Sequence, residues 1–276
     1  MNRLSLQDRA RILSCLVEGN SMRATSRMCD VSINTVTKLL VDVGTACAIY
    51  QNEVLRNLPC KRIQCDEIWT FCHSKQKNVA PWNQGIVGHG DVWTWTAMCA
   101  DTKLVPSWLV GRRDGGYALD FIQDLAGRLA NRIQLTTDGH KAYLNAVDQV
   151  FGSEIDYAML IKLYGEPKGA GNERRYSPAQ CTGTITGTVN GMPDPAHIST
   201  SYVERQNLTM RMSMRRFTRL TNGFSKKIDN LEHALALHYM HYNFARIHKS
   251  LRVTPAMAAG VSNHVWSIES IAKLAD

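Results

Sequence analysis

Residues 62–72 read RIQCDEIWTFC, an apolar run rich in β-branched and aromatic side chains that predicts a largely buried β-strand. A carboxylate in the middle of such a run has to be hydrogen-bonded, ion-paired or bound to a metal ion. Asp66 is therefore the first candidate functional residue, and side-chain alternation places its neighbour Glu67 on the other face of the strand. The alternative is a strand whose Asp66 face is open to solvent.

The segments that follow this strand predict a mixed sheet covered by helices. Two further strands, a helix, a strand, a helix and a strand are expected, in that order, over residues 91–100, 104–110, 117–130, 132–137, 140–151 and 155–163. Such an order of elements is typical of the α/β class. Four tryptophans alternate with polar positions in these strands, and we expect them to pack in the core: Trp69, Trp93, Trp95 and Trp108.

Residues 165–198 interrupt this pattern, because they contain four prolines and the Gly/Thr-rich stretch CTGTITGTVNG. They predict a long surface insertion or a small hairpin. Helical periodicity returns over 200–217 and 230–247, which predicts two more helices.

The first 45 residues predict three short helices. Ser5 followed by Asp8 resembles a capping box, and Ser21 and Ser32 can cap the second and third helices. The outward face of the third helix would carry Asn34, Thr35, Thr37 and Lys38. Two short helices joined by a tight turn, the second presenting polar and basic side chains, form the helix-turn-helix pattern that enters the major groove of DNA. The alternative is a three-helix cap on a larger domain.

The expected organisation is a helix-turn-helix module over 1–50, a linker over 51–61, an α/β core over 62–260 with an insertion at about 165–198, and a tail over 261–276. With 276 residues, 44% of them hydrophobic, the chain can form such cores and is not a disordered protein. It has no apolar stretch of roughly 18 residues and no apolar N-terminal segment, so we expect a cytoplasmic protein without a membrane span.

The net charge of +8 is unevenly distributed along the chain. Residues 1–62 carry +4 and residues 199–252 carry +7, whereas residues 63–198 carry −2 and the last 24 residues carry −1. Two basic regions that flank a slightly acidic one indicate a polyanion held at both ends, with carboxylates between them.

Two more acids, Asp138 and Glu204, are candidate functional residues because of their positions in the predicted elements. Asp138 ends a predicted strand and precedes Gly139, at the edge where open α/β sheets place their ligands, although Asp-Gly is also a common turn. Glu204 lies in STSYVERQNLTMRMSMRRF, and Asn207 and Arg211 follow it on the same helix face. The alternative for Glu204 is a solvated polar face of a surface helix.

An Asp in the first strand, an Asp after the fourth strand and a Glu on a later helix resemble the catalytic core of the integrase-type (DDE) transposases of bacterial insertion sequences. SYVERQN resembles the helix of the family's third acid, and YNFARIHKSLRVTPAMAAGV at 242–261 resembles its closing segment. The resemblance covers about residues 60–260, and the helices ahead of it match the family's domain order. Asp138 and Glu204 are 66 positions apart, farther than in many members, which we explain by the insertion. Other acids in that interval, none of them on a basic helix, are Glu166, Glu173 and Asp194.

The resemblance implies a ribonuclease-H-like fold and a transposase that binds the ends of an insertion element. It further implies Mg²⁺-dependent strand cleavage by water, followed by attack of the freed 3′-OH on target DNA. Two divalent ions, Mg²⁺ or Mn²⁺ in its place, suit phosphodiester chemistry and prefer oxygen ligands. We therefore expect Asp66 to bridge both ions, with Asp138 on one and Glu204 on the other.

The basic residues near Glu204 are candidates for contacts with DNA phosphates. Together with one histidine they are Arg205, Arg211, Arg215, Arg216, Lys226, Lys227, His248 and Lys249. The residues expected to read the ends of the element are Ser32, Asn34, Thr35 and Lys38.

Two other functions remain open at this point. The chain could be a catalytically silent DNA-binding regulator or domesticated remnant of the same fold, although it keeps all three acids. It could also be a nuclease acting on RNA–DNA hybrids, which the N-terminal helices disfavour. The transposase hypothesis implies double-stranded DNA as the partner, a homodimer or larger assembly that joins two ends, and a nucleoid-associated, prokaryotic protein.

Overall fold

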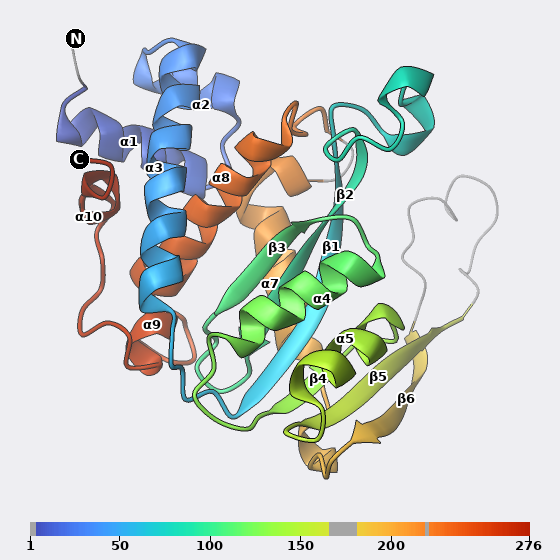
Figure 1. The fold of residues 1–276 in the computed structure, drawn as a ribbon. Helices are drawn as coiled ribbons and strands as arrows, with labels where there is room; N and C mark the ends of the chain where they lie inside the picture. The colour runs from blue at the N-terminus through green and yellow to red at the C-terminus, as the bar shows by residue number, and fades with distance from the viewer. Residues whose placement is uncertain (1–3, 166–180, 219–220) are drawn as a thin grey trace.

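The computed structural model describes residues 4–165, 181–218 and 221–276, which are built around a mixed β-sheet (Figure 1). Among these residues the sheet has six strands in the order β3-β2-β1-β4-β5-β6. Their bounds are β1 (Arg62–Cys72), β2 (Gly90–Cys99), β3 (Ser107–Gly111), β4 (Gln134–Thr137), β5 (Asp156–Tyr164) and β6 (Cys181–Asn190). The helices are α1 (Leu6–Val17), α2 (Met22–Cys29), α3 (Ile33–Val54), α4 (Gly115–Ala126), α5 (Ala142–Phe151), α7 (Ser201–Ser213), α8 (Ile228–Met240), α9 (Pro255–Ala258) and α10 (Ile268–Lys273).

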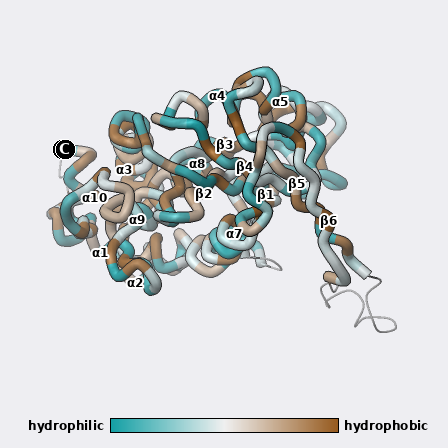
Figure 2. Tube along the Cα trace, turned by 90° about the horizontal axis from the view of Figure 1, so that it is seen from below, coloured by the Kyte–Doolittle hydropathy of each residue, from teal (hydrophilic) through white to brown (hydrophobic). Residues whose placement is uncertain are grey.

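The pairing of the strands confirms the expected fold class. β1, β2 and β3 form an antiparallel meander, β4 and β5 add parallel to β1, and β6 pairs antiparallel with β5. Helices lie on both sides: α4 and α5 on one face of the sheet, α7 on the other (Figure 2). The molecule therefore has the α/β, ribonuclease-H-like sheet that the sequence predicts, together with an N-terminal helical part.

The third strand begins later than expected, at Ser107 instead of Leu104. The backbone of Val105 makes two hydrogen bonds with the side-chain amide of Asn243. The Val105 N–H donates to Asn243 Oδ1 at 3.0 Å, and the Val105 carbonyl accepts from Asn243 Nδ2 at 3.0 Å. Pro106 follows and has no N–H to offer a neighbouring strand. These two residues thus belong to a buried connection that anchors the segment after α8.

Part of the expected insertion extends the sheet. Residues 181–190 form β6, which pairs antiparallel with β5 from Tyr157 to Tyr164, so within the described residues this part of the insertion is an edge strand of the main sheet and not a separate small hairpin. Asp194 caps a short 3-10 helix at Pro195–His197. Glu166 and Glu173 lie outside the described residues.

The three N-terminal helices begin at the expected caps. The hydroxyls of Ser5, Ser21 and Ser32 accept hydrogen bonds from backbone N–H groups one turn into α1, α2 and α3. The prediction of a short third helix and a linker from residue 51 is wrong at this boundary, because α3 continues to Val54. The second half of α3 packs along α8, and buried Gln51 donates from Nε2 to the Ala236 carbonyl at 3.0 Å.

The C-terminal residues close against the first helix. α10 packs on α1, and the Arg9 side chain donates to the Ala272 carbonyl at 3.2 Å and pairs with Asp276 at 2.6 Å. The first and last helices of the described residues therefore lie side by side (Figure 1). Within the residues that the structure describes, no helix combines the length and apolar character needed to cross a membrane.

Gly44 marks the closest approach of α3 to α8. A Cβ at this position would lie 2.6–2.8 Å from the Cβ, carbonyl oxygen and Cα of His233, two of which are backbone atoms. We expect Gly44→Ala to lower the free energy of unfolding by about 1–3 kcal/mol, because this overpacking outweighs the roughly 1 kcal/mol helix preference of Ala. Urea unfolding measures the change. Gly115→Ala is the matched control, since a Cβ there meets nothing within 4 Å; equal stabilities of the two variants would contradict the prediction.

Candidate active site

Asp66 and Asp138 are neighbours because of strand register. β1 and β4 are parallel, and Cys65 of β1 pairs with Thr137 of β4. Asp66 follows Cys65 and Asp138 follows Thr137, at the point where the pairing of the two strands ends. Both aspartates and Glu204 of α7 line one open cleft of about 800 Å³, here called the acid cleft. The structure thus brings together the three acids that the sequence singles out.

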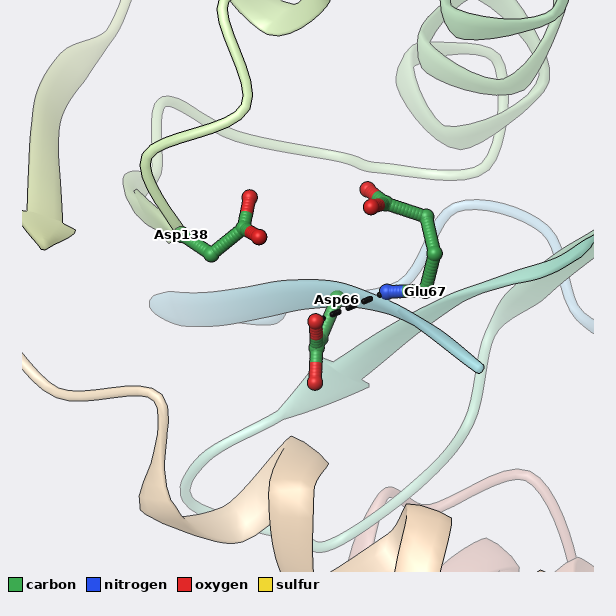
Figure 3. Close-up of side chains that lie close together, drawn as sticks. All are labelled: Asp66, Glu67 and Asp138. Atoms are coloured by element: carbon green, nitrogen blue, oxygen red, sulfur yellow. Dashed lines mark hydrogen bonds between the residues drawn. The ribbon is translucent and has the colours of Figure 1, made fainter. Parts of the chain in front are cut away.

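Asp66 projects from β1 toward α7 (Figure 3). Its Oδ2 accepts a hydrogen bond from Asn207 Nδ2 at 2.8 Å, and its Oδ1 accepts from the Glu67 N–H at 2.9 Å. Burial, followed by the charges of Glu67 and Asp138, raises the pKa of Asp66 from 3.8 to about 8. The carboxyl of Asp66 is therefore held in an environment that disfavours its charge unless a cation is added.

Glu67 is a fourth acid of the site, which sequence reasoning set aside because it points to the other face of β1. That orientation is correct, but β4 ends at Thr137, and Glu67 and Asp138 extend to the same side beyond it (Figure 3). Carboxylate oxygens of Asp66, Glu67 and Asp138 lie within 4.8 Å of one another. Burial and the charge of Asp138 raise the pKa of Glu67 to about 7.

Arg113 bridges two of these acids. Its Nε donates to Glu67 Oε2 at 2.9 Å, and its Nη2 donates to Asp138 Oδ2 at 3.3 Å. The guanidinium also lies over the Trp93 ring, 4.9 Å from its centre. The backbone N–H of His140 donates to the other oxygen of Asp138 at 3.0 Å. Nothing in the sequence pattern indicated Arg113, because it reaches the site from the loop after β3.

Glu204 stands on the first turn of α7, across the cleft from this cluster. Thr200 donates from Oγ1 to Glu204 Oε1 at 2.7 Å, and Lys162 of β5 pairs with Oε2. Within the described residues, the tight acid cluster contains Glu67 and not Glu204. Glu204, Asn207 and Arg211 do share the helix face predicted for them, and all three line the acid cleft.

The donor set fits a hard divalent cation. Carboxylate and amide oxygens are the ligands that Mg²⁺ and Mn²⁺ prefer, and no thiol or imidazole belongs to the cluster. The Asn207 amide offers one more oxygen, because its Oδ1 is buried and accepts no hydrogen bond within the described part of the chain. Asp66, Glu67 and Asp138 could hold a cation between them, and Glu204 lies on the same cleft.

The expected phosphate contacts do not all gather at the acids. Arg211 lines the acid cleft and also the next groove of about 890 Å³, here called the aromatic groove. α7 ends at Ser213 and the backbone of Met214 is extended, so Arg215 and Arg216 begin a separate 3-10 turn that lines the aromatic groove. Four of the expected contacts line neither the acid cleft, nor the aromatic groove, nor the third groove described next: Arg205, Lys227, His248 and Lys249.

A third groove continues to the N-terminal helices. It shares Arg215 and Arg216 with the aromatic groove, also contains Lys226, and is bounded by Ile33 and Thr37 of α3. Ser32, Asn34 and Lys38 are exposed at the start of α3, and the Ser32 hydroxyl is 3.0 Å from that of Thr35. A path of shared basic residues therefore joins the acid cleft to the helix that the sequence assigns to DNA reading.

No family model and no curated protein matches this chain. Among solved structures it is similar to the Mos1 strand transfer complex, with 12% identity and a TM-score of 0.22, and to the Mos1 transposase paired-end complex with left transposon end, with 10% and 0.21. A pre-cleavage Mos1 transpososome follows at 9% and 0.22. These matches cover 54%, 54% and 57% of this chain but only 56%, 58% and 60% of the Mos1 chains.

Proposed function

We propose that this chain is a metal-dependent DNA transposase of the insertion-sequence type, which cleaves DNA strands at element ends and transfers them to a target. One observation carries the proposal. Asp66 of β1, Asp138 after β4 and Glu204 of α7 line a single open cleft, and basic grooves lead from that cleft to the N-terminal helices. Carboxylates from three separate elements at one sheet edge suit hydrolysis of a phosphodiester better than binding alone.

Each acid has a proposed role. Asp66 and Asp138 would hold one divalent ion and Asp66 with Glu204 a second, with Mg²⁺ as the proposed ion and Mn²⁺ as its replacement. When bound, such ions lower the pKa of an attacking water and stabilise the leaving oxygen. Asn207 fixes the orientation of Asp66 through its 2.8 Å hydrogen bond. Arg211 neutralises a phosphate that enters the cleft.

The N-terminal part supplies recognition in this proposal. The exposed side chains of Ser32, Asn34 and Lys38 and the half-buried Thr35, at the start of α3, read base edges in the major groove of the element end. Because two ends are joined in one reaction, the active form is a homodimer or a larger assembly. The domain organisation proposed is a DNA-reading module that leads into a catalytic core over about 62–260.

The test is cleavage of DNA that carries the inverted repeats flanking this coding sequence, in Mg²⁺, in Mn²⁺ and in EDTA. We expect strand-specific nicks at the element end with either ion, none in EDTA, and none on a scrambled end of the same length. Salt-dependent binding of the ends without any nicking would favour the silent regulator instead. Cleavage of an RNA–DNA hybrid but not of the ends would favour the hybrid-specific nuclease.

A further inference from the structure

The aromatic groove combines three partly exposed aromatic rings with a strongly basic lining, and a fourth ring, that of Phe217, is buried in its wall. Trp69 and Phe71 come from the second half of β1, and Phe224 comes from the segment that precedes α8. The ring centres of Trp69 and Phe71 are 5.9 Å apart, and those of Phe71 and Phe224 are 4.6 Å apart with 34° between the planes. The residues lining the groove include five Lys or Arg side chains and no acid: Lys75, Lys77, Arg211, Arg215 and Arg216.

These rings differ from the tryptophans that stabilise the core. Trp95 is fully buried and Trp108 packs against the core, as the sequence predicts. Trp69 is only partly buried and lines the groove, so the prediction of core packing is wrong for this residue. The reason is that β4 pairs with β1 only as far as Cys65, and beyond it that edge of β1 has no neighbouring strand among the described residues, apart from an isolated bridge between Cys72 and Ser225.

The groove adjoins the acid cleft. Both are lined by Arg211, and Trp69 follows Glu67, another residue of the acid cleft, by two residues on the same face of β1, which is about 7 Å at roughly 3.3 Å per residue. Stacked nucleotides rise about 3.4 Å each, so this spacing corresponds to about two nucleotides. A strand whose phosphate sits at the acids can therefore place a nearby base on the rings.

We propose that the aromatic groove binds an unpaired stretch of DNA strand next to the cleaved phosphate, with a base stacked on Trp69. This position relative to the cleavage point rests on the proposed function; the binding itself does not. Aromatic platforms inside basic grooves are the usual means of holding single strands, because every base has a face to stack and every nucleotide a phosphate to pair. In a duplex the bases stack on each other, so a duplex would meet the lysines and arginines and leave the rings unused.

The experiment measures equilibrium binding of the full chain, in EDTA, to a fluorescent thymidine oligonucleotide of about twelve nucleotides and to a duplex of the same length. Trp69→Ala is compared with Trp69→Phe, which keeps a stacking ring. The matched control is Trp82→Ala, because Trp82 is 80% exposed and lies outside the groove. Lys75→Ala with Lys77→Ala tests the charges, against Lys61→Ala with Lys273→Ala, which are exposed and do not line the groove.

We expect Trp69→Ala to weaken binding of the single strand about 5- to 100-fold and binding of the duplex less than about twofold, with Trp69→Phe close to wild type. Trp82→Ala should change neither affinity. Equal single-strand affinities for Trp69→Ala and Trp82→Ala would overturn the proposal, as would equal losses on both DNAs. Because no metal ion is needed, a groove that binds single strands in a protein that never cleaves DNA would uphold this inference and refute the proposed function.

Discussion

Asp66→Asn is expected to slow metal-dependent strand cleavage at least about 10³-fold while duplex binding stays within about twofold of wild type. The carboxylate stands at the middle of the site, with Asp138 beside it and Glu204 across the cleft. An amide cannot replace its negative charge toward a divalent cation. Single-turnover cleavage of end-bearing DNA in Mg²⁺ gives the rate, and fluorescence anisotropy gives the binding.

The same substitution should stabilise the protein in the absence of divalent ions. Burial and the neighbouring Glu67 and Asp138 carboxylates disfavour the charge of Asp66, and Asn removes that charge. Asn207 can turn its amide so that its unused Oδ1 accepts from the new side chain. We therefore expect the melting temperature to rise by a few °C as activity is lost, a trade common at functional sites.

Asp148→Asn is the matched control for this experiment, because Asp148 is exposed on α5 and does not line the acid cleft. Its cleavage rate and melting temperature should match wild type. Asp138→Asn and Glu204→Gln should lose cleavage as Asp66→Asn does, with Glu53→Gln on α3 as the control for the glutamate. Cleavage that persists in all three acid variants would refute the assigned site.

The position of the two aspartates could be predicted because it depends on local patterns. RIQCDEIWTFC reads as a buried strand with an acid in its interior, and RIQLTT reads as a buried strand directly before an acid; the structure adds that the two strands are parallel neighbours. Glu204 was singled out as an acid on a basic helix with Asn207 and Arg211 on the same face, and by its place after the two aspartates in the order that the family resemblance implies. The period of a strand or a helix is enough to place all three acids within their elements.

Other parts of the site depend on contacts between distant segments. Glu67 joins the cluster because β4 is short, and Arg113 and Lys162 reach the acids from the loop after β3 and from β5. The length of α3 was misjudged for a similar reason: polar Gln51 is buried by a hydrogen bond to Ala236, 185 positions away. Sequence periodicity carries no information about such partners.

The sequence pattern also did not predict where α7 ends and which way the chain turns after it. Arg215 and Arg216 follow Arg211 at spacings that would extend one basic helix beside the acids. The extended backbone of Met214 ends that helix and turns the two arginines toward the aromatic groove. The distribution of charge therefore located the basic segment correctly. The end of α7 determines that Arg215 and Arg216 line the aromatic groove and not the acid cleft.

Without divalent ions, the free energy of unfolding is expected to fall between about pH 4 and pH 8. The folded protein raises the pKa of Asp66 to about 8 and that of Glu67 to about 7, both above their ordinary values. In this window the folded state binds more protons than the unfolded state, so stability decreases as pH rises, by a few kcal/mol in total. Urea unfolding at several pH values in EDTA measures the slope, which should be smaller in Asp66→Asn and unchanged in Asp148→Asn.

Mg²⁺ should oppose this fall, because it binds the folded carboxylates and displaces their protons. The stabilisation by a fixed Mg²⁺ concentration is then small near pH 5 and grows toward pH 8, since fewer protons have to leave. Asp66→Asn should lose most of this gain, whereas Asp148→Asn should keep it. If the free energy of unfolding is the same with and without Mg²⁺ at every pH, the acid cluster holds no divalent cation. This conclusion does not depend on whether the protein binds DNA.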